Sequence, residues 1–275
     1  MSTVQAGVLP GADGSAVPDR YRGVWARTLL EAPGVRDDRS FVRWLQTSVW
    51  HADLRIPLMS RPVAAQAPGA QLGQPLALRL AGQQGFCGMT EVRQQAAGEV
   101  CTWHRLSDFQ PAREAADAGV MVFDGPDRVI ETGLHASYLE VWERLPGSTG
   151  RSIVLAGQDE AGQDNAERVL VAGRYLMRVR PRRLALSPDR EPGQSLADVV
   201  ARHPDIAREI LDFEISFGRL DAGHWTIEHS TLPELEGRSL PCRFQHESEF
   251  QARIEGDFST LPWQVIEWDC TDSSI

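Results

Sequence analysis

The sequence predicts an all-β protein built from two antiparallel β-barrels. Short runs rich in aromatic and β-branched residues, such as "GFCGMTEV" and "GEVCTWHRLSDF", are separated by clusters of glycine, proline and aspartate. This pattern is typical of antiparallel strands in a sandwich or barrel. In addition, the pattern Y-x-x-V-W-x-R occurs at residues 21–27 and again at residues 138–144. An internal repeat of this kind favours two related β units over one large sheet.

The elements follow in order along the chain. Residues 1–19 are rich in glycine, alanine and proline without a period, which predicts a disordered leader. We expect a first barrel over residues 20–112 and a second barrel over residues 113–275, because turn-forming residues near 108–119 separate the two copies of the repeat. Residues 61–76, rich in proline, glycine and alanine, predict a long loop.

A short helical segment is expected in the second barrel. In "SLADVVARHPDIAREILDF", Ser195 is followed three residues later by Asp198, which is a short-armed version of a helix-capping box. Pro204 should divide the segment into two short helices, because proline cannot continue a helix. In the second helix, Ile206 and Ile210 are expected to face inward.

The composition argues against several classes of partner. The net charge is −10, and all 28 cationic side chains are arginines. Such a chain repels phosphate backbones and anionic membrane surfaces, so we expect neither a nucleic-acid nor a membrane partner. The chain has no long apolar run and no signal-peptide pattern at its start, which predicts a cytoplasmic protein.

Motifs for catalysis or metal binding are absent from the sequence. It contains no G-x-S-x-G, H-E-x-x-H, glycine-rich phosphate loop or C-x-x-C pair, and the four cysteines are expected to be reduced. We therefore assign no catalytic residue and no metal site, and we expect a protein that is not an enzyme. A cofactor cannot be named: some small barrels hold heme through one histidine, but no histidine stands out as its ligand.

The stretch "VWHADLRIP" (49–57) carries the most distinctive alternation. As a strand it places Trp50, Ala52, Leu54 and Ile56 on one face, and a polar row of His51, Asp53 and Arg55 on the other. The apolar set is the natural lining of a barrel, which leaves the polar row outside, where charged side chains pair with neighbouring strands. The alternative turns the strand over, so that the polar row lines a site for a polar ligand.

Tryptophans and arginines supply the other candidate residues. An apolar ligand would contact tryptophan side chains, and we expect these to be Trp44, Trp50, Trp103 and Trp142. Arg105 lies on the same strand face as Trp103 and could stack on it, which is either a structural contact or part of a binding site. The arginine-rich stretch "RYLMRVRPRR" (174–183) is either a solvated strand edge or a patch for an acidic partner.

The segment "DAGVMVFDGPDRVIETGLHASYLEVWERL" (117–145) resembles a known family. Its D-x-G-x-M, E-x-G and Y-x-E-x-W patterns are similar to those of the lipocalin-like proteins typified by a fungal casein-kinase-interacting protein. "VWHADLRIP", "GFCGMTEV" and "CTWHRLSDFQP" resemble earlier strands of that family, so the resemblance spans residues 21–180. It implies two lipocalin-like (calycin-type) barrels packed side by side, without a transferable activity.

The G-x-W pattern at Gly23 and Trp25 also matches the opening of calycin barrels. That resemblance implies that Trp25 closes one barrel end and that an arginine from a late strand, here Arg144, stacks on it.

Three functions remain open at this point. The first is non-enzymatic binding of a small, largely apolar ligand, and a cavity lined by tryptophans would support it. The second is a scaffold with filled barrels that binds a protein partner, which an exposed apolar patch would support. The third is an enzyme that uses the polar row, which a polar cavity containing His51 would support.

Overall fold

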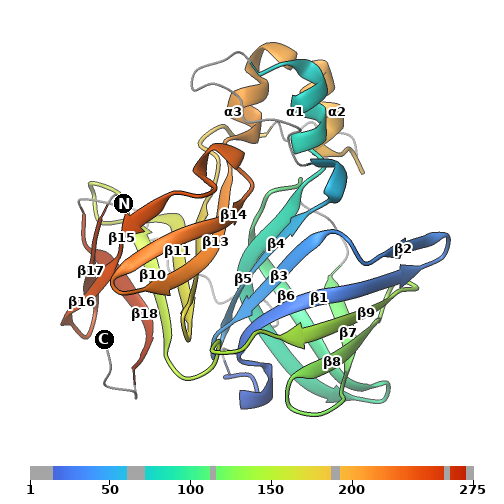
Figure 1. Ribbon diagram of the computed structural model, residues 1–275, viewed down its shortest axis with the longest axis horizontal. Helices are drawn as coiled ribbons and strands as arrows, with labels where there is room; N and C mark the ends of the chain where they lie inside the picture. Colours follow the sequence, from blue (N-terminus) through green and yellow to red (C-terminus); the bar gives the residue numbers. More distant parts are fainter. Residues whose placement is uncertain (1–14, 61–71, 112–115, 187–192, 257–260, 271–275) are drawn as a thin grey trace, which may run out of the picture.

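We describe a computed structural model of the chain, which covers residues 15–60, 72–111, 116–186, 193–256 and 261–270. Two nine-stranded antiparallel sheets stand side by side, and short helices cover one end of both (Figure 1). The predicted all-β class is therefore confirmed. Within the described residues, no helix has the length and apolar character needed to cross a bilayer.

The first sheet closes into a barrel. Its spatial order is β2-β1-β3-β4-β5-β6-β7-β8-β9, and β1 also pairs with β9, so that all strands except β2 form a closed eight-stranded ring. The strands are β1 (Gly23–Ala32), β2 (Val35–Asp37), β3 (Phe41–Gln46), β4 (Trp50–Ile56), β5 (Gln84–Gln95), β6 (Gly98–Asp108), β7 (Asp117–Phe123), β8 (Arg128–Gly133) and β9 (Leu139–Arg144).

This barrel continues past the boundary that the sequence predicted at residues 112 and 113. The reason lies in the repeated Y-x-x-V-W-x-R pattern, because its two copies lie on β1 and β9, which are neighbouring strands of one barrel. Trp25 is opposite Arg144, and Arg27 is opposite Trp142. The repeat therefore marks the seam that closes the first barrel, and its interpretation as two equivalent units, one in each barrel, was wrong.

The second sheet is curled into a half-barrel. Its order is β15-β14-β13-β12-β11-β10-β18-β17-β16, and in the described part of the chain its two end strands do not pair with each other. Cys242 alone separates those end strands, so one stretch of chain supplies both edges. The strands are β10 (Ser152–Gln158), β11 (Asp164–Ala172), β12 (Tyr175–Arg180), β13 (Glu214–Asp221), β14 (His224–Ser230), β15 (Ser239–Pro241), β16 (Arg243–Ser248), β17 (Gln251–Glu255) and β18 (Trp263–Asp269).

The α-helices are α1 (Gln74–Leu80), α2 (Leu196–Arg202) and α3 (Ala207–Leu211), and the 3₁₀ turns are η1 (Asp19–Tyr21), η2 (Leu58–Ser60), η3 (Pro204–Ile206) and η4 (Pro233–Leu235). The capping box is present, because Ser195 Oγ accepts from the Asp198 amide and the Asp198 carboxylate accepts from the Ser195 amide. Pro204 separates α2 from α3 as predicted. Ile210 is buried, but Ile206 is exposed, so its predicted inward orientation was wrong.

Two predictions about irregular segments need correction. Helix α1 begins inside the predicted loop, because a proline at its first turn and the leucine-rich run after it favour helix. Most of that loop, residues 61–71, lies outside the described residues. So does most of the predicted disordered leader, residues 1–14. Within the rest of the leader, Val17 is anchored to the first barrel: its side chain is buried, and its amide donates to the Ser48 carbonyl at 2.7 Å.

The two sheets share one large apolar core. The apolar face of β4 packs against residues of the second sheet such as Ile215 and Phe217, and all three α-helices contribute side chains to the same core. The contact between the sheets is close, because a Cβ added at Gly85 on β5 would lie 2.5 Å from a methyl carbon of Ile215. The second sheet also has its own core on its other face, built around Trp225 and Trp263.

Glu267 on β18 fastens the second sheet to the β3–β4 turn of the barrel. Its carboxylate accepts hydrogen bonds from the hydroxyl groups of Thr47 (3.1 Å) and Ser48 (2.6 Å). It also accepts from the backbone amides of Ser48, Val49 and Trp50, at 3.1 to 3.3 Å. Because a turn leaves its amides without sheet partners, this one carboxylate satisfies most of the donors at the start of β4.

We expect Glu267→Ala to lower the free energy of unfolding by about 2–4 kcal/mol, because it leaves a row of partly buried amide donors without an acceptor. Urea denaturation followed by tryptophan fluorescence measures the change. Glu249→Ala is the matched control, since Glu249 is exposed in the turn between β16 and β17; it should cost less than about 0.5 kcal/mol. Equal losses in both variants would contradict the role of Glu267 as an anchor between the sheets.

Candidate functional site

The polar row of β4 points into the first barrel. His51 is fully buried, Asp53 is 2% exposed, and the Arg55 guanidinium lies 5.5 Å from the centre of the Phe86 ring inside the lumen. The apolar set of the same strand faces the second sheet. The predicted orientation of this strand was therefore wrong, because the packing of a second sheet on the barrel makes its outer surface the more apolar side.

His51 takes part in a hydrogen-bonded chain inside the first barrel. Its Nδ1 lies 3.0 Å from Thr90 Oγ1, and the Thr90 hydroxyl donates to Gln46 Oε1 at 2.7 Å. Because the hydroxyl proton is used on Gln46, Nδ1 carries the imidazole proton and donates to Thr90. Burial, together with the nearby Arg105 and His104, lowers the pKa of His51 well below its usual value. The ring is therefore neutral at neutral pH.

The tryptophans fill the lumen. Trp44 lies at its centre: its ring stacks on Trp25 with centroids 6.2 Å apart, and it meets Trp103 and Trp142 edge-on at 5.5 and 5.8 Å. All four of these residues are less than 10% exposed. Trp50, the remaining candidate for ligand contact, lies outside the lumen in the core between the two sheets. These side chains therefore contact one another rather than surround a cavity.

The barrel end near the start of β1 is closed by Trp25 and Arg144. The Arg144 guanidinium lies 4.6 Å from the centre of the Trp25 ring. It also donates to the carbonyl groups of Arg22, Arg20 and Pro126 at 2.6 to 2.8 Å. The Trp25 indole N–H donates to the Tyr21 carbonyl at 2.7 Å. This end consequently offers no access to the lumen.

The opposite end of the barrel holds a polar cavity of about 490 Å³. It lies where β1 runs into β2 and where β4 ends. Arginine and acidic side chains make up much of its wall, together with the tyrosine and the small residues of the β8–β9 turn. The lining residues are Arg27, Leu30, Ala32, Asp37, Ser40, Val42, Arg55, Pro57, Gln84, Arg105, Asp117, Glu131, Ala136, Ser137, Tyr138 and Glu140.

Each arginine of the cavity is held by two carboxylates. Arg27 bonds Asp37 at 2.6 Å and Glu140 at 2.7 Å. Arg55 bonds Asp53 at 2.7 Å and approaches the same Glu140 oxygen at 3.7 Å. These pairs orient the guanidinium groups along the wall, because a carboxylate and a guanidinium match in plane and spacing.

Arg105 is held in the same way on the other side of the lumen. Its guanidinium bonds Asp108 at 2.8 Å and also bonds Asp117, and it stacks on the Phe86 ring at 3.6 Å. The stacking expected on Trp103 is thus made with Phe86 on the neighbouring strand. Asp108 also accepts from the backbone amide of Gln110 at 2.9 Å.

Glu131 differs from the other carboxylates of the cavity. It is 3% exposed and lies directly opposite Glu140 across β8 and β9. Its oxygens accept from the Tyr138 hydroxyl at 2.6 Å and from the Trp142 indole at 3.0 Å. Burial and the adjacent Glu140 raise the pKa of Glu131 to about 8. A carboxyl group in this position keeps its proton at neutral pH.

Several cavity residues were not identified as a site from the sequence. Asp117, Glu131, Tyr138 and Glu140 all lie within the segment that carries the family resemblance, at the spaced positions of its motifs. Within each motif the named residues are two positions apart, which puts them on one face of their own strand, and this was the available signal. Arg27 was marked only as the last position of the repeated Y-x-x-V-W-x-R pattern. Asp37 had no comparable signal, because its role depends on the pairing of β2 with β1, which brings it next to Arg27.

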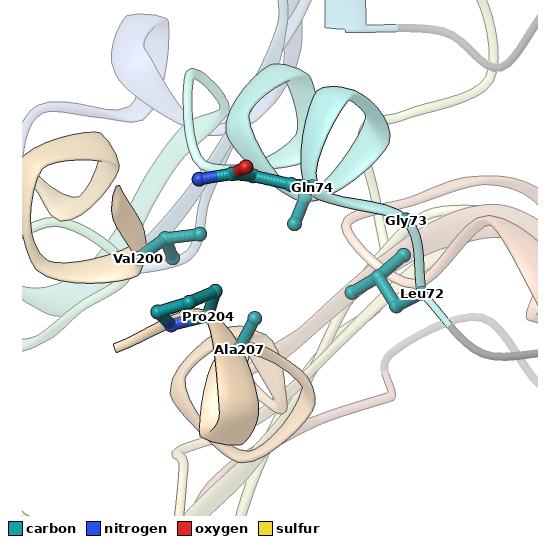
Figure 2. Close-up of a pocket in the computed structure, with 7 residues that line it drawn as sticks. Leu72, Gly73, Gln74, Val200, Pro204 and Ala207 are labelled. Atoms are coloured by element: carbon teal, nitrogen blue, oxygen red, sulfur yellow. The ribbon is translucent and has the colours of Figure 1, made fainter. Parts of the chain in front are cut away.

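A second hollow, of about 270 Å³, lies between α1 and the helices α2 and α3 (Figure 2). Leu72, Ala77, Val200, Pro204 and Ala207 line it, and Gln74 is the one polar side chain among the described lining residues. These described residues include no charged group to fix the orientation of a ligand, whereas specific sites combine an apolar wall with a few placed polar groups. The charged cavity is therefore the stronger candidate.

Arg178 and Arg180 of the arginine-rich stretch, and the buried Cys87, have structural roles. In the arginine-rich stretch, Arg178 pairs with Glu167 and Glu214, and Arg180 pairs with Asp212 at 2.7 Å. Burial raises the pKa of Cys87 to about 12, so this thiol is not activated as a nucleophile. Within the described residues, no group of three or more His, Cys, Asp or Glu side chains is arranged so that it could hold a metal ion.

Comparison with known proteins shows the fold. No protein-family model matches the sequence. No curated protein matches it either. Among solved structures, the chain is similar to the uncharacterised protein YLR301w from Saccharomyces cerevisiae, with 17% sequence identity and a TM-score of 0.55. The alignment covers 90% of this chain and 98% of the yeast chain. The two proteins share one architecture over almost their full lengths.

The raised pKa of Glu131 predicts a loss of stability as the pH rises from about 4.5 to about 8. Above its ordinary value of 4.5 the unfolded chain loses this proton while the folded chain keeps it, so the free energy of unfolding falls until the pH reaches about 8. Glu131→Gln holds the group neutral. We expect this variant to gain on the order of 2 kcal/mol over the wild type between pH 5 and pH 8.

Urea denaturation across this pH range measures the difference between the two proteins. Glu143→Gln is the control, because Glu143 is an exposed residue of β9; its difference from the wild type should stay flat. A flat profile for Glu131→Gln would show that Glu131 is ionised in the folded protein.

Proposed function

We propose that this is a lipocalin-like binding protein and that its ligand is a small polar molecule held in the charged cavity of the first barrel. The observation that carries the proposal is the composition of this cavity, about 490 Å³ with three arginines and four carboxylates in its wall. A site with fixed charges at known positions selects a ligand by its polar groups. The likeness to the yeast protein supports the fold on which the proposal rests and nothing about the ligand.

The proposal changes the ligand class expected from the sequence. An apolar ligand would need the tryptophans as its lining, but Trp44, Trp103 and Trp142 pack against one another. None of the tryptophans contributes to the wall of the cavity. An apolar ligand placed against this charged wall would displace the water that hydrates the charged groups and would offer them no hydrogen bonds in its place. This loss of hydration costs free energy. A polar ligand replaces those hydrogen bonds.

Binding is also better supported than the other two functions. For an enzyme built on the polar row, His51 is not part of the cavity wall, and Arg55 and Asp53 are bonded to each other. For a scaffold, the described chain does expose large apolar side chains, but the most exposed of them, Met59 and Phe250, lie on η2 and on the β16–β17 turn. Met59 and Phe250 therefore lie on separate elements and do not form one apolar patch.

The proposal is tested with four-carbon molecules that differ in charge: 1,4-diaminobutane, 1,4-butanediol and succinate, together with agmatine. Isothermal titration of the full chain should detect binding of at least one of them with a Kd below about 1 mM, which corresponds to about 4 kcal/mol. Native mass spectrometry of freshly purified protein adds an independent search for a retained ligand.

The control variants are Ser137→Trp, which fills the cavity mouth, and Thr149→Trp, which changes an exposed threonine outside the cavity. We expect Ser137→Trp to weaken binding by tenfold or more and Thr149→Trp to leave it unchanged. Absence of binding by every probe and of any retained mass, or equal binding by both variants, would overturn the proposed site.

A further inference from the structure

The charges around the cavity are unequal in number. Three guanidinium groups, those of Arg27, Arg55 and Arg105, are paired with five carboxylates. Glu131 is a sixth carboxyl group, and among the described residues it has no ion pair with any cationic side chain. The wall therefore has an excess of acidic groups, even though its arginines are the more conspicuous residues.

Glu131 is placed to meet a ligand. It is 3% exposed and belongs to the cavity wall. Its side chain lies over Gly119, where an added Cβ would come within 2.6 Å of its Cγ. Tyr138 packs in the same way on Gly133, where a Cβ would lie 2.4 Å from the tyrosine ring. The two glycines leave room for this carboxyl–tyrosine pair to sit at the cavity surface.

The other carboxylates of the wall are already engaged. Asp37, Asp117 and Glu140 each bond a guanidinium group, which neutralises them and holds them apart along the wall. A metal ion would require several of them to converge on one point. A ligand with one compact positive charge needs only Glu131 and a hydrogen-bond partner such as Tyr138.

We propose that the cavity selects a small organic cation, with a primary ammonium or guanidinium group that pairs with Glu131 and displaces its proton. This inference rests on the proposed function, since it names the ligand class of that same site. The exchange balances: the neutral carboxyl group of the free protein releases one proton to solvent, and the resulting carboxylate pairs with the cation. The net charge of the site is therefore unchanged, because the cation brings one positive charge and the released proton removes one.

The groups that face Glu131 support the direction of this exchange. They are Glu140 on β9, Asp117 on β7, Tyr138 in the β8–β9 turn and Arg55 on β4. The two carboxylates and burial oppose ionisation of Glu131, and Arg55 and the Tyr138 hydrogen bond favour it. A bound cation adds a second favourable charge and moves the balance toward the carboxylate. A bound anion would instead oppose the ionisation of Glu131.

Isothermal titration of 1,4-diaminobutane and agmatine in phosphate and in HEPES buffer tests the exchange, because these buffers differ in ionisation enthalpy and neither contains a primary ammonium group. At pH 7 we expect release of close to one proton for each bound cation. Affinity should rise about tenfold between pH 6 and pH 7 and level off above pH 8, where Glu131 loses its proton without a ligand. Succinate and 1,4-butanediol should bind at least tenfold more weakly.

The Glu131→Gln variant keeps the size of the side chain; its amide oxygen can accept from the Trp142 indole and its NH2 group can donate to the Tyr138 hydroxyl oxygen, so the wall is preserved. In this variant we expect proton release and pH dependence to disappear and cation affinity to fall tenfold or more. Glu143→Gln should behave as the wild type. Binding of a cation without proton release, or preferential binding of succinate or 1,4-butanediol, would overturn this inference and leave the proposed polar site intact. Absence of binding by any probe would remove the proposed function itself.

Discussion

The burial of β4 on both of its faces is the constraint on which the rest of the structure depends. One face must be apolar because it packs against the second sheet, and the other is polar because it enters the first barrel. Charged side chains inside a barrel need partners there, since a buried charge without a partner is costly. Strands far from β4 in sequence supply them: Glu140 from β9 for Arg55, and Thr90 from β5 for His51. The charged cavity is thus a consequence of how the two sheets pack.

The sequence predicted local structure well. Antiparallel strands, the capping box at Ser195 and the break at Pro204 follow from propensities that act within a few residues, and the structure contains all three. It predicted the two faces of β4 but assigned them to the wrong sides. Alternation identifies which residues share a face, whereas the orientation of that face depends on the second sheet, and no feature within residues 49–57 carries that information.

The same distinction separates the predicted part of the site from the part that was missed. Asp53, Arg55 and Arg105 were candidates because each stands out within its own strand. The acidic residues that pair with them were recognised only as elements of a resemblance, since their role requires β7, β8 and β9 to close the barrel against β1.

Trp44 and Trp142 were expected to line a cavity and instead fill the lumen. The number of aromatic residues in a sequence indicates how much side-chain volume can fill a core, but it does not show whether the folded core leaves space for a ligand.

The single residue between β15 and β16 has a consequence for association with other molecules. An unpaired sheet edge is a template for aggregation, because its backbone donors and acceptors can bind a strand from another chain. Here both edges belong to one stretch of chain that turns at Cys242, whose own amide donates to the Gly223 carbonyl at 2.8 Å. One edge is only three residues long, and the other carries Arg243 and Glu247. The two end strands of the half-barrel can therefore remain unpaired with each other without offering a long, uncharged strand edge to a neighbouring molecule.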